Sequence, residues 1–226
     1  MSISFVIPCR NEEDNILNTV NEIIESTKNI PDYEIVIIDD CSSDKTNDII
    51  KDLSENNNKI IQITNDLNLG YGGSFIKGYK VATKNYIILM PGDNCFPASE
   101  IEKMIINYKN FDLIMSIPTE MNDKREKHRK FFSKAFTLTV NILFNYNFRY
   151  YNGIPVIKKD VLEKINIKSK SPFFMAEIVL KTLKIKSTYD QREIFFIERK
   201  FGKTGIFNIK TVAKTIIDLI KLRINY

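Results

Sequence analysis

The sequence predicts an α/β fold with a mostly parallel sheet and helices on both faces of that sheet. Strand-like and helix-like segments alternate through the first half of the 226 residues, which is the pattern of parallel strands joined by helices. The strand-like segments are apolar throughout, as is typical of strands covered on both faces. The composition, 43% hydrophobic and 27% charged, is that of a globular protein and excludes collagen-like or wholly disordered chains.

Strands and helices are predicted in strict alternation over residues 3–116. The strands are short apolar runs that end near Pro, Asp or Asn: Ile3–Pro8, Glu34–Ile38, Lys59–Thr64, Tyr86–Met90 and Asp112–Ser116. The helices between them carry apolar residues at helical spacing: Glu13–Lys28, Asp44–Leu53 with Ser43 or Asp44 as its cap, Gly73–Ala82, and Ser99–Tyr108.

The last part of the chain predicts one more strand, Glu193–Ile197, and a basic amphipathic helix over residues 206–226. Apolar residues of this helix fall on one stripe, and Lys and Arg flank the stripe. Such a helix can lie on an anionic bilayer or pack against the sheet. We therefore expect one domain over residues 1–205, followed by this helix.

The charge is divided unevenly along the chain. The net charge is +5, but residues 1–120 hold 10 Lys and Arg against 19 Asp and Glu, whereas residues 121–226 hold 23 against 9. The basic half is expected to meet an anionic partner such as a phosphate or a membrane surface. A solvated, Lys-rich surface is the alternative.

Several classes of site are disfavoured by composition. Cys9, Cys41 and Cys95 have no paired spacing, which argues against a disulfide framework and a zinc site. A single histidine, His128, argues against His-based metal clusters and Ser-His-Asp triads. The sequence holds no apolar run of about 18 residues and no basic signal-peptide start. A cytoplasmic protein is expected.

Polar residues gather where the predicted strands end, in the segments Pro8–Glu13, Asp39–Asp44, Asn68–Gly73 and Pro91–Asn94. Open parallel sheets bind ligands at this edge. Asp39 and Asp40 could accept hydrogen bonds from a ribose or a base, or cap the next helix. The glycines could approach a pyrophosphate or form a tight turn. Asp93 could bind a divalent ion, or cap the helix near Ser99 and Glu100.

In order and spacing, these segments resemble family 2 glycosyltransferases of the GT-A fold, in the branch of the dolichol- and polyprenyl-phosphate sugar synthases. The matches are Pro8–Glu13 (P-x-Y-N-E-E), Asp39–Thr46 (D-D-x-S-x-D-x-T), Asn68–Gly73 (N-x-G-x-G-x), Pro91–Pro97 (D-A-D-L-Q-x-P) and Arg199–Thr204 (R-x-x-G-x-S/T). The resemblance covers about residues 3–205. It implies a Rossmann-like GT-A catalytic domain, with a nucleotide-sugar-binding half at residues 1–117 and an acceptor-binding half at residues 118–205.

The resemblance also implies a donor site, with catalytic roles for Asp93 and Arg199. The nucleotide sugar would be bound by Pro8, Arg10, Glu12, Asp39, Asp40, Gly70, Gly73 and Asp93. A divalent cation, Mg²⁺ or Mn²⁺, would be bound by Asp93. Two departures bear on that metal, because Pro91 stands where the family has the first Asp and Cys95 where it often has Gln. Arg10 stands where a Tyr often stacks on the base, and a guanidinium can stack too.

For the acceptor, the resemblance implies a lipid phosphate bound by Arg125, Arg129, Ser133, Glu177, Arg199 and Lys203. A phosphate oxygen is already anionic, so it requires cations rather than a general base. A hydroxyl acceptor would require a carboxylate base. Relatives that use hydroxyls often carry a carboxylate pair where residues 173–177 have Glu177 alone. A solvated loop is the alternative for the basic residues of 124–130.

The sequence therefore favours an inverting glycosyltransferase that moves a sugar from a nucleotide sugar to a polyprenyl phosphate, peripherally bound at the cytoplasmic face of a membrane. The alternatives are transfer to a sugar hydroxyl during surface-polysaccharide assembly, and a GT-A relative that binds nucleotide without turnover. A nucleotidyltransferase would need a Gly-rich loop after the first strand, and Pro8–Glu13 has no Gly. Nucleic acid is not expected as a partner, because the acidic loops would repel its phosphates.

Overall fold

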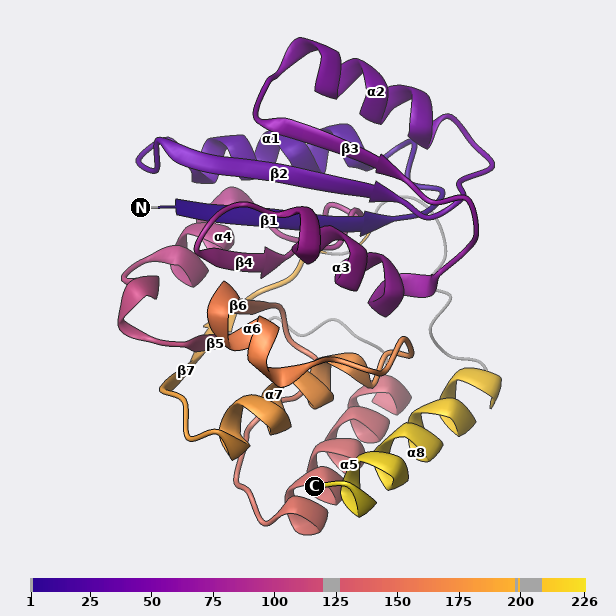
Figure 1. Cartoon of the computed structure of the whole chain (residues 1–226), viewed down its shortest axis with the longest axis vertical. Coiled ribbons are helices and arrows are strands. Elements are labelled where there is room, and N and C mark those ends of the chain that lie inside the picture. Colours follow the sequence, from indigo (N-terminus) through magenta and orange to yellow (C-terminus); the bar gives the residue numbers. More distant parts are fainter. Residues whose placement is uncertain (1, 120–126, 198, 200–208) are drawn as a thin grey trace.

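The computed structural model describes residues 2–119, 127–197, 199 and 209–226 (Figure 1). Its centre is a seven-stranded sheet of order β3-β2-β1-β4-β6-β5-β7. The strands are β1 (Ser2–Cys9), β2 (Asp32–Asp39), β3 (Ile60–Thr64), β4 (Tyr86–Leu89), β5 (Leu113–Pro118), β6 (Pro155–Lys158) and β7 (Tyr189–Ile194). All neighbours pair in parallel except β6, which is antiparallel to both β4 and β5. The predicted α/β fold is confirmed.

The helices divide between the two faces of the sheet. They are α1 (Ile16–Ser26), α2 (Thr46–Asn56), α3 (Gly70–Val81), α4 (Ala98–Ile105), α5 (Lys127–Phe144), α6 (Lys159–Ile165), α7 (Phe174–Lys184) and α8 (Ile209–Ile224), with a short 3-10 helix at Tyr108–Asn110. One buried cluster joins a face of the sheet to α1, α2 and α4. The other joins the opposite face to α3, α6 and α7, and reaches α5 and α8. Both faces are covered, as the apolar strands predict.

The second half of the sheet departs from a simple alternation of strand and helix. The fifth predicted strand does not pair with β4, because β6 lies between the two. β7 begins at Tyr189 and ends at Ile194, so the prediction of a strand over Glu193–Ile197 was wrong in its bounds. Beyond β7, the Ile197 amide still donates to the Cys95 carbonyl (3.0 Å), which ties this segment to the loop after β4.

The first four strands place their carboxyl ends at one edge of the sheet. Cys9 pairs with Asp39, and Asp39 pairs with Thr64. The Met90 amide, directly after β4, donates to the Val6 carbonyl (2.9 Å). The order of strands puts β4 in the middle of the sheet. The four polar segments predicted from sequence therefore share one edge.

Helices α5 and α8 lie side by side below α6 and α7 (Figure 1). Their contact includes the Phe144 and Tyr226 rings, whose centroids are 4.8 Å apart. Large apolar side chains remain exposed on both helices: Phe131, Phe132, Leu138 and Ile142 on α5, and Ile216, Ile217, Ile220 and Ile224 on α8. We call these eight residues the α5–α8 apolar face. Within the described ranges, no helix combines the length and the apolar character needed to cross a bilayer.

Replacing Gly78 with Ala is expected to destabilise the fold by about 1–3 kcal/mol, because the added methyl overpacks a filled core. A Cβ at Gly78 would lie 2.5 Å from Val6 Cγ1 and from Ile38 Cδ1, and both of those side chains are fully buried. Urea unfolding measures the change. Lys80→Ala, on the exposed side of the same helix, is the control and should shift the free energy of unfolding by about 0.5 kcal/mol or less. A Gly78 variant as stable as this control would contradict the close packing.

Candidate functional site

The loop after β4 brings Asp93 to the centre of the carboxyl edge. A Cβ at Gly92 would lie 2.9 Å from Cys9 Cβ, so the loop packs tightly on the end of β1. The Asn94 amide donates to Thr19 Oγ1 (3.0 Å), and Asn94 adopts a left-handed conformation (φ 54°). These contacts hold Asp93 next to the segment that follows β1.

Asp93 lies close to two other ionisable side chains of this edge, Glu12 and Tyr71. Burial raises the pKa of the Glu12 carboxyl, and the charge of Asp93 adds to that effect, while hydrogen bonds from Asn15 and the positive charge of Arg199 oppose it. Tyr71 is 38% exposed as a residue, but desolvation of its hydroxyl raises the pKa of that group, with further contributions from Asp93 and Glu12. The edge therefore concentrates negative charge in a partly desolvated place, which favours a bound cation or a cationic side chain.

Arg199 supplies such a cation. Its Nη2 donates to Glu12 Oε1 (2.8 Å) and Oε2 (2.7 Å), and the two side chains are 19% and 11% exposed. The sequence predicts that Arg199 turns back to the active edge, with a surface pair to Glu198 or Asp190 as the alternative. Asp190 instead pairs with Arg192 (2.9 Å). The structure places Arg199 at the carboxyl edge of the sheet, where it pairs with Glu12.

The Asp39 and Asp40 carboxylates are both buried and both bind within the protein. Asp40 accepts hydrogen bonds from Asn65 Nδ2 and from the amides of Leu69 and Gly70, each at 2.8 Å. Asp39 accepts from the hydroxyl and the amide of Ser42. Asp40 thus fixes the start of α3, where the glycine-rich segment begins, and Asp39 shapes the turn before α2.

Asp44 has a structural role, but the prediction that Ser43 or Asp44 is the cap of the following helix was wrong, because Lys45 is the N-cap of α2 and its side chain makes no capping hydrogen bond. Asp44 Oδ1 accepts from the amide (3.0 Å) and the hydroxyl (2.6 Å) of Thr46, the first residue of α2. Its Oδ2 accepts from the Glu13 amide (3.2 Å). Burial raises the pKa of the Asp44 carboxyl, but these hydrogen bonds outweigh burial and hold the pKa below its ordinary value.

Glu177 lies buried on α7 and faces the backbone of the preceding loop. It accepts hydrogen bonds from the amides of Lys168 (3.1 and 3.2 Å) and Ser169 (2.8 Å), and it pairs with Lys181. These partners account for both carboxylate oxygens. The contacts give Glu177 a role in holding residues 168–169, whereas acceptor binding by Glu177 stays a prediction.

The other predicted site residues are placed as follows. Pro8 and Gly73 are buried, Arg10 is exposed at the end of β1, and Ser133 is half-buried on α5. The backbone of Arg129 belongs to α5, but its side chain lies outside the described part of the structure, and Arg125 and Lys203 lie outside it altogether. The Gly70 amide donates to Asp40 and to Asn68 Oδ1, so it is already paired.

The loop after β4 fits a divalent cation that is shared with a ligand. Asp93 Oδ1 and Asn94 Oδ1 are buried and have no hydrogen-bond partner in the described structure. Such unpaired oxygens are costly unless something binds them. Among the described residues, no three His, Cys, Asp or Glu side chains converge on one metal position. Mg²⁺ commonly takes one or two protein carboxylates and fills its other positions with substrate phosphates and water. Asp93 and Asn94 match that arrangement.

Three residues of this site were not singled out from the sequence. Tyr71 adjoins Asp93, Asn65 bonds to Asp40, and Thr19 anchors Asn94. Tyr71 could have been found, because it stands between glycines of a recognised motif. Asn65 and Thr19 belong to no motif, and only their position in the folded chain reveals them.

Comparison with known proteins identifies relatives in sequence. The chain is 27% identical over 154 residues to a dolichyl-phosphate beta-glucosyltransferase of Trichomonas vaginalis, covering 62% of this chain and 47% of that protein. It is 27% identical over 230 residues to a dolichol-phosphate mannosyltransferase of Pyrococcus furiosus, covering 98% of this chain and 62% of that protein. The chain therefore spans less than two thirds of the length of either relative.

Solved structures share the fold. A glucosyl-3-phosphoglycerate synthase from Mycobacterium tuberculosis, in complex with Mn²⁺, UDP and phosphoglyceric acid, superposes with a TM-score of 0.72 at 12% identity over 98% of this chain and 78% of that one. A mannosyltransferase from Pyrobaculum calidifontis, in complex with GDP-Man and Mn²⁺, gives 0.65 at 12% identity over 99% and 64%. These likenesses concern the GT-A fold alone. Residues 4–166 match the family described as Glycosyl transferase family 2, and the chain belongs to that family.

Proposed function

We propose that the chain transfers a sugar from a nucleotide sugar to the phosphate of a polyprenyl lipid, with inversion at the anomeric carbon. The observation that carries the proposal is the packing of the Asp93 loop on the Glu12–Arg199 pair at the centre of the carboxyl edge, where a Cβ at Gly92 would lie 3.6 Å from Glu12 Cγ. It offers carboxylate and guanidinium groups together where a sugar diphosphate would be cleaved. The two dolichol-phosphate enzymes among its relatives support a lipid phosphate as the acceptor.

In the proposed reaction, an oxygen of the lipid phosphate bonds to the anomeric carbon while the bond from that carbon to the donor diphosphate breaks. The bonding electrons leave with the nucleoside diphosphate. The attacking oxygen is already anionic, so no proton has to be removed. A divalent cation would neutralise charge on the diphosphate. Asp93 would hold that cation, with Asn94 as a second oxygen ligand, and Arg199 would donate N–H groups to phosphate oxygens.

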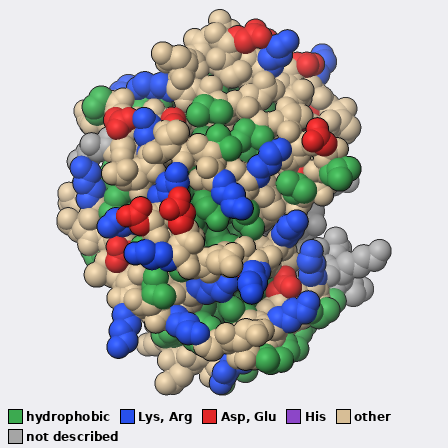
Figure 2. All heavy atoms as spheres, viewed as in Figure 1, with side chains coloured by type: hydrophobic (Ala, Val, Ile, Leu, Met, Phe, Trp, Pro, Cys, Tyr) green, Lys and Arg blue, Asp and Glu red, His purple; other side chains and the backbone are tan. Residues whose placement is uncertain are grey.

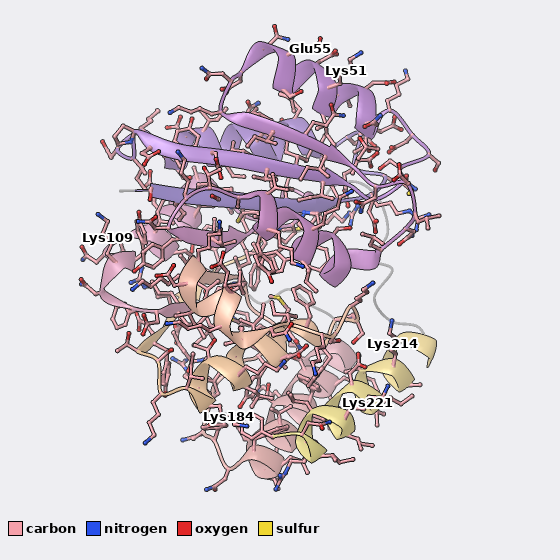
Figure 3. All side chains as sticks on the ribbon, viewed as in Figure 1. Lys51, Glu55, Lys109, Lys184, Lys214 and Lys221 are labelled. Carbon is pink, nitrogen blue, oxygen red and sulfur yellow. The ribbon has the colours of Figure 1, made fainter. Side chains whose placement is uncertain are left out.

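The proposal places the α5–α8 apolar face on the surface of an anionic bilayer. Hydrophobic side chains gather along the lower right edge of the molecule, over α8, beside Lys and Arg (Figure 2). Lys214 and Lys221 extend from α8 (Figure 3). Each Lys or Arg near an anionic surface contributes about 1 kcal/mol of attraction. The strands β1, β2 and β3 point toward the carboxyl edge, and the first turns of α5 and α8 lie on that same side of the molecule (Figure 1).

The test is a panel of UDP- and GDP-sugars with undecaprenyl phosphate in anionic vesicles, with Mg²⁺, Mn²⁺ or EDTA. A lipid-linked sugar that forms with one donor and disappears in the Asp93→Ala variant would support the proposal. The proposal fails if the wild-type chain transfers sugar only to soluble hydroxyl acceptors, or binds a nucleotide sugar without turnover.

Replacing Glu177 with Gln is expected to lower stability by about 1–3 kcal/mol, because the buried ion pair with Lys181 is lost. Turnover at matched folded fraction should stay within a few-fold of wild type, since the Gln oxygen can still accept from the Lys168 and Ser169 amides and keep that backbone in place. Thermal unfolding and initial rates measure the two effects. Glu163→Gln, exposed on α6, is the control. A large loss of turnover, together with transfer to soluble sugars, would identify Glu177 as a general base and favour the polysaccharide alternative.

A further inference from the structure

Asp218 is the one acidic residue in the sequence of α8. It does not face solvent freely: its Oδ2 accepts hydrogen bonds from Ser169 Oγ (2.7 Å) and Ser171 Oγ (2.6 Å). Both serines are buried, and their hydroxyl oxygens lie 2.9 Å apart. Hydrogen bonds to a charged oxygen are stronger than neutral ones. Asp218 therefore ties α8 firmly to residues 168–171.

The segment held by Asp218 forms the packing surface for the start of α3. A Cβ at Gly72 would lie 3.1 Å from the Lys170 carbonyl carbon and oxygen, and one at Gly70 would lie 3.7 Å from the same oxygen. The Lys170 side chain lies over Gly73, with its Cδ 3.6 Å from the Cβ position there. The backbone of Lys170 thus rests on the glycine-rich turn whose first amides bind Asp40.

Two carboxylates hold residues 168–171, and they come from different helices. Glu177, on α7, accepts from the Lys168 and Ser169 amides and belongs to the core of the domain. Asp218 belongs to α8, which also packs inward through Leu219 and Leu222 and leaves Ile216 and Ile220 exposed. Just beyond the helix, the Tyr226 hydroxyl donates to the Leu180 carbonyl (2.7 Å), so the far end of α8 is held against α7. Apolar packing is not directional, whereas hydrogen bonds set position. Asp218 therefore sets where the middle of α8 lies relative to the glycine-rich turn.

We infer that Asp218 is a positioning residue that couples α8 to the nucleotide site. Through Ser169 and Ser171 it holds residues 168–171 against the first turn of α3, so that the placement of α8 sets the affinity of this edge for a nucleoside diphosphate. The identity of the ligand as a nucleoside diphosphate rests on the proposed function, but the coupling between α8 and α3 does not. If the α5–α8 apolar face binds a bilayer, this connection carries the effect of that binding to the donor site.

The experiment compares the wild-type chain with Asp218→Asn and with the double variant Ser169→Ala/Ser171→Ala. Amide hydrogen exchange of residues 69–75 and 168–173 is measured without ligand, and binding of UDP and GDP with Mn²⁺ is measured by calorimetry. Both variants should exchange faster in both segments and weaken nucleotide binding by about five-fold or more, as for a modest coupling between sites. Combining the variants should add little, because they remove the same contacts.

Asp52→Asn, the same chemical change on the exposed surface of α2, is the control and should alter neither measurement. The inference is overturned if Asp218→Asn changes exchange in α8 alone and leaves residues 69–75 and the nucleotide Kd as in the wild-type chain. If Asp218→Asn does not fold, Ser171→Ala alone is used with the same readouts. If the wild-type chain binds neither nucleotide, the proposed function fails, while the exchange measurement still decides the coupling.

Discussion

The Asp93→Ala variant is expected to lose about a hundred-fold or more in kcat/KM, the scale of removing one preorganised electrostatic group from a site of this kind. Asp93 is the sole carboxylate of the segment Pro91–Pro97, and its Oδ1 is buried without a partner in the described structure. Under the proposed function, removing it would take away the carboxylate ligand for a cation on the diphosphate. Initial rates with a nucleotide sugar and undecaprenyl phosphate measure the loss.

Asp44→Ala is the matched control. Asp44 lies at the same edge, but its oxygens bond to Thr46 and Glu13. Its removal should cost about 1 kcal/mol of stability, the scale of losing a hydrogen bond, with little loss of turnover at matched folded fraction. Equal losses of turnover in the two variants would contradict the assignment of Asp93. Wild-type activity that persists in EDTA would show that Asp93 acts without a metal.

The second large effect is expected for Arg199→Lys. The lysine keeps the positive charge beside Glu12, but it cannot reproduce the planar set of donors that grips two phosphate oxygens. We expect a loss of about 2–3 kcal/mol of transition-state stabilisation, as for one preorganised donor. The measurement is kcat/KM for the lipid phosphate acceptor.

The Glu12→Gln variant distinguishes two roles of Arg199, its ion pair with Glu12 and its contact with a phosphate ligand. If Arg199 serves only to neutralise Glu12, then Arg199→Lys should preserve activity and Glu12→Gln should change stability alone. If Arg199 binds phosphate, Arg199→Lys should impair kcat/KM even at full folded fraction. A value within a few-fold of wild type for Arg199→Lys would remove Arg199 from the catalytic machinery.

The first four strands, and the loops that follow them, were predictable from sequence. Apolar runs such as Ile3–Pro8 and Glu34–Ile38 have no polar face, so both faces of these strands can be buried only between two layers of helices. Helical connections make such strands parallel, and parallel strands bring their carboxyl ends to one edge. The shared edge of Asp40 and Asp93 follows from that logic and is what the structure shows.

The tertiary structure alone decided three features. β6 is four residues long and lies antiparallel between β4 and β5. A run this short has too little periodicity to predict either its direction or its neighbours. Glu12 and Arg199 are 187 residues apart in sequence, and Asp218 meets Ser169 across 49. Local sequence patterns predict which face of a segment is buried. Which side chain pairs with a buried charge depends on how elements distant in sequence pack together. Sequence patterns therefore predicted the layers of the fold and the edge where the polar residues gather, whereas packing decided which side chains meet there.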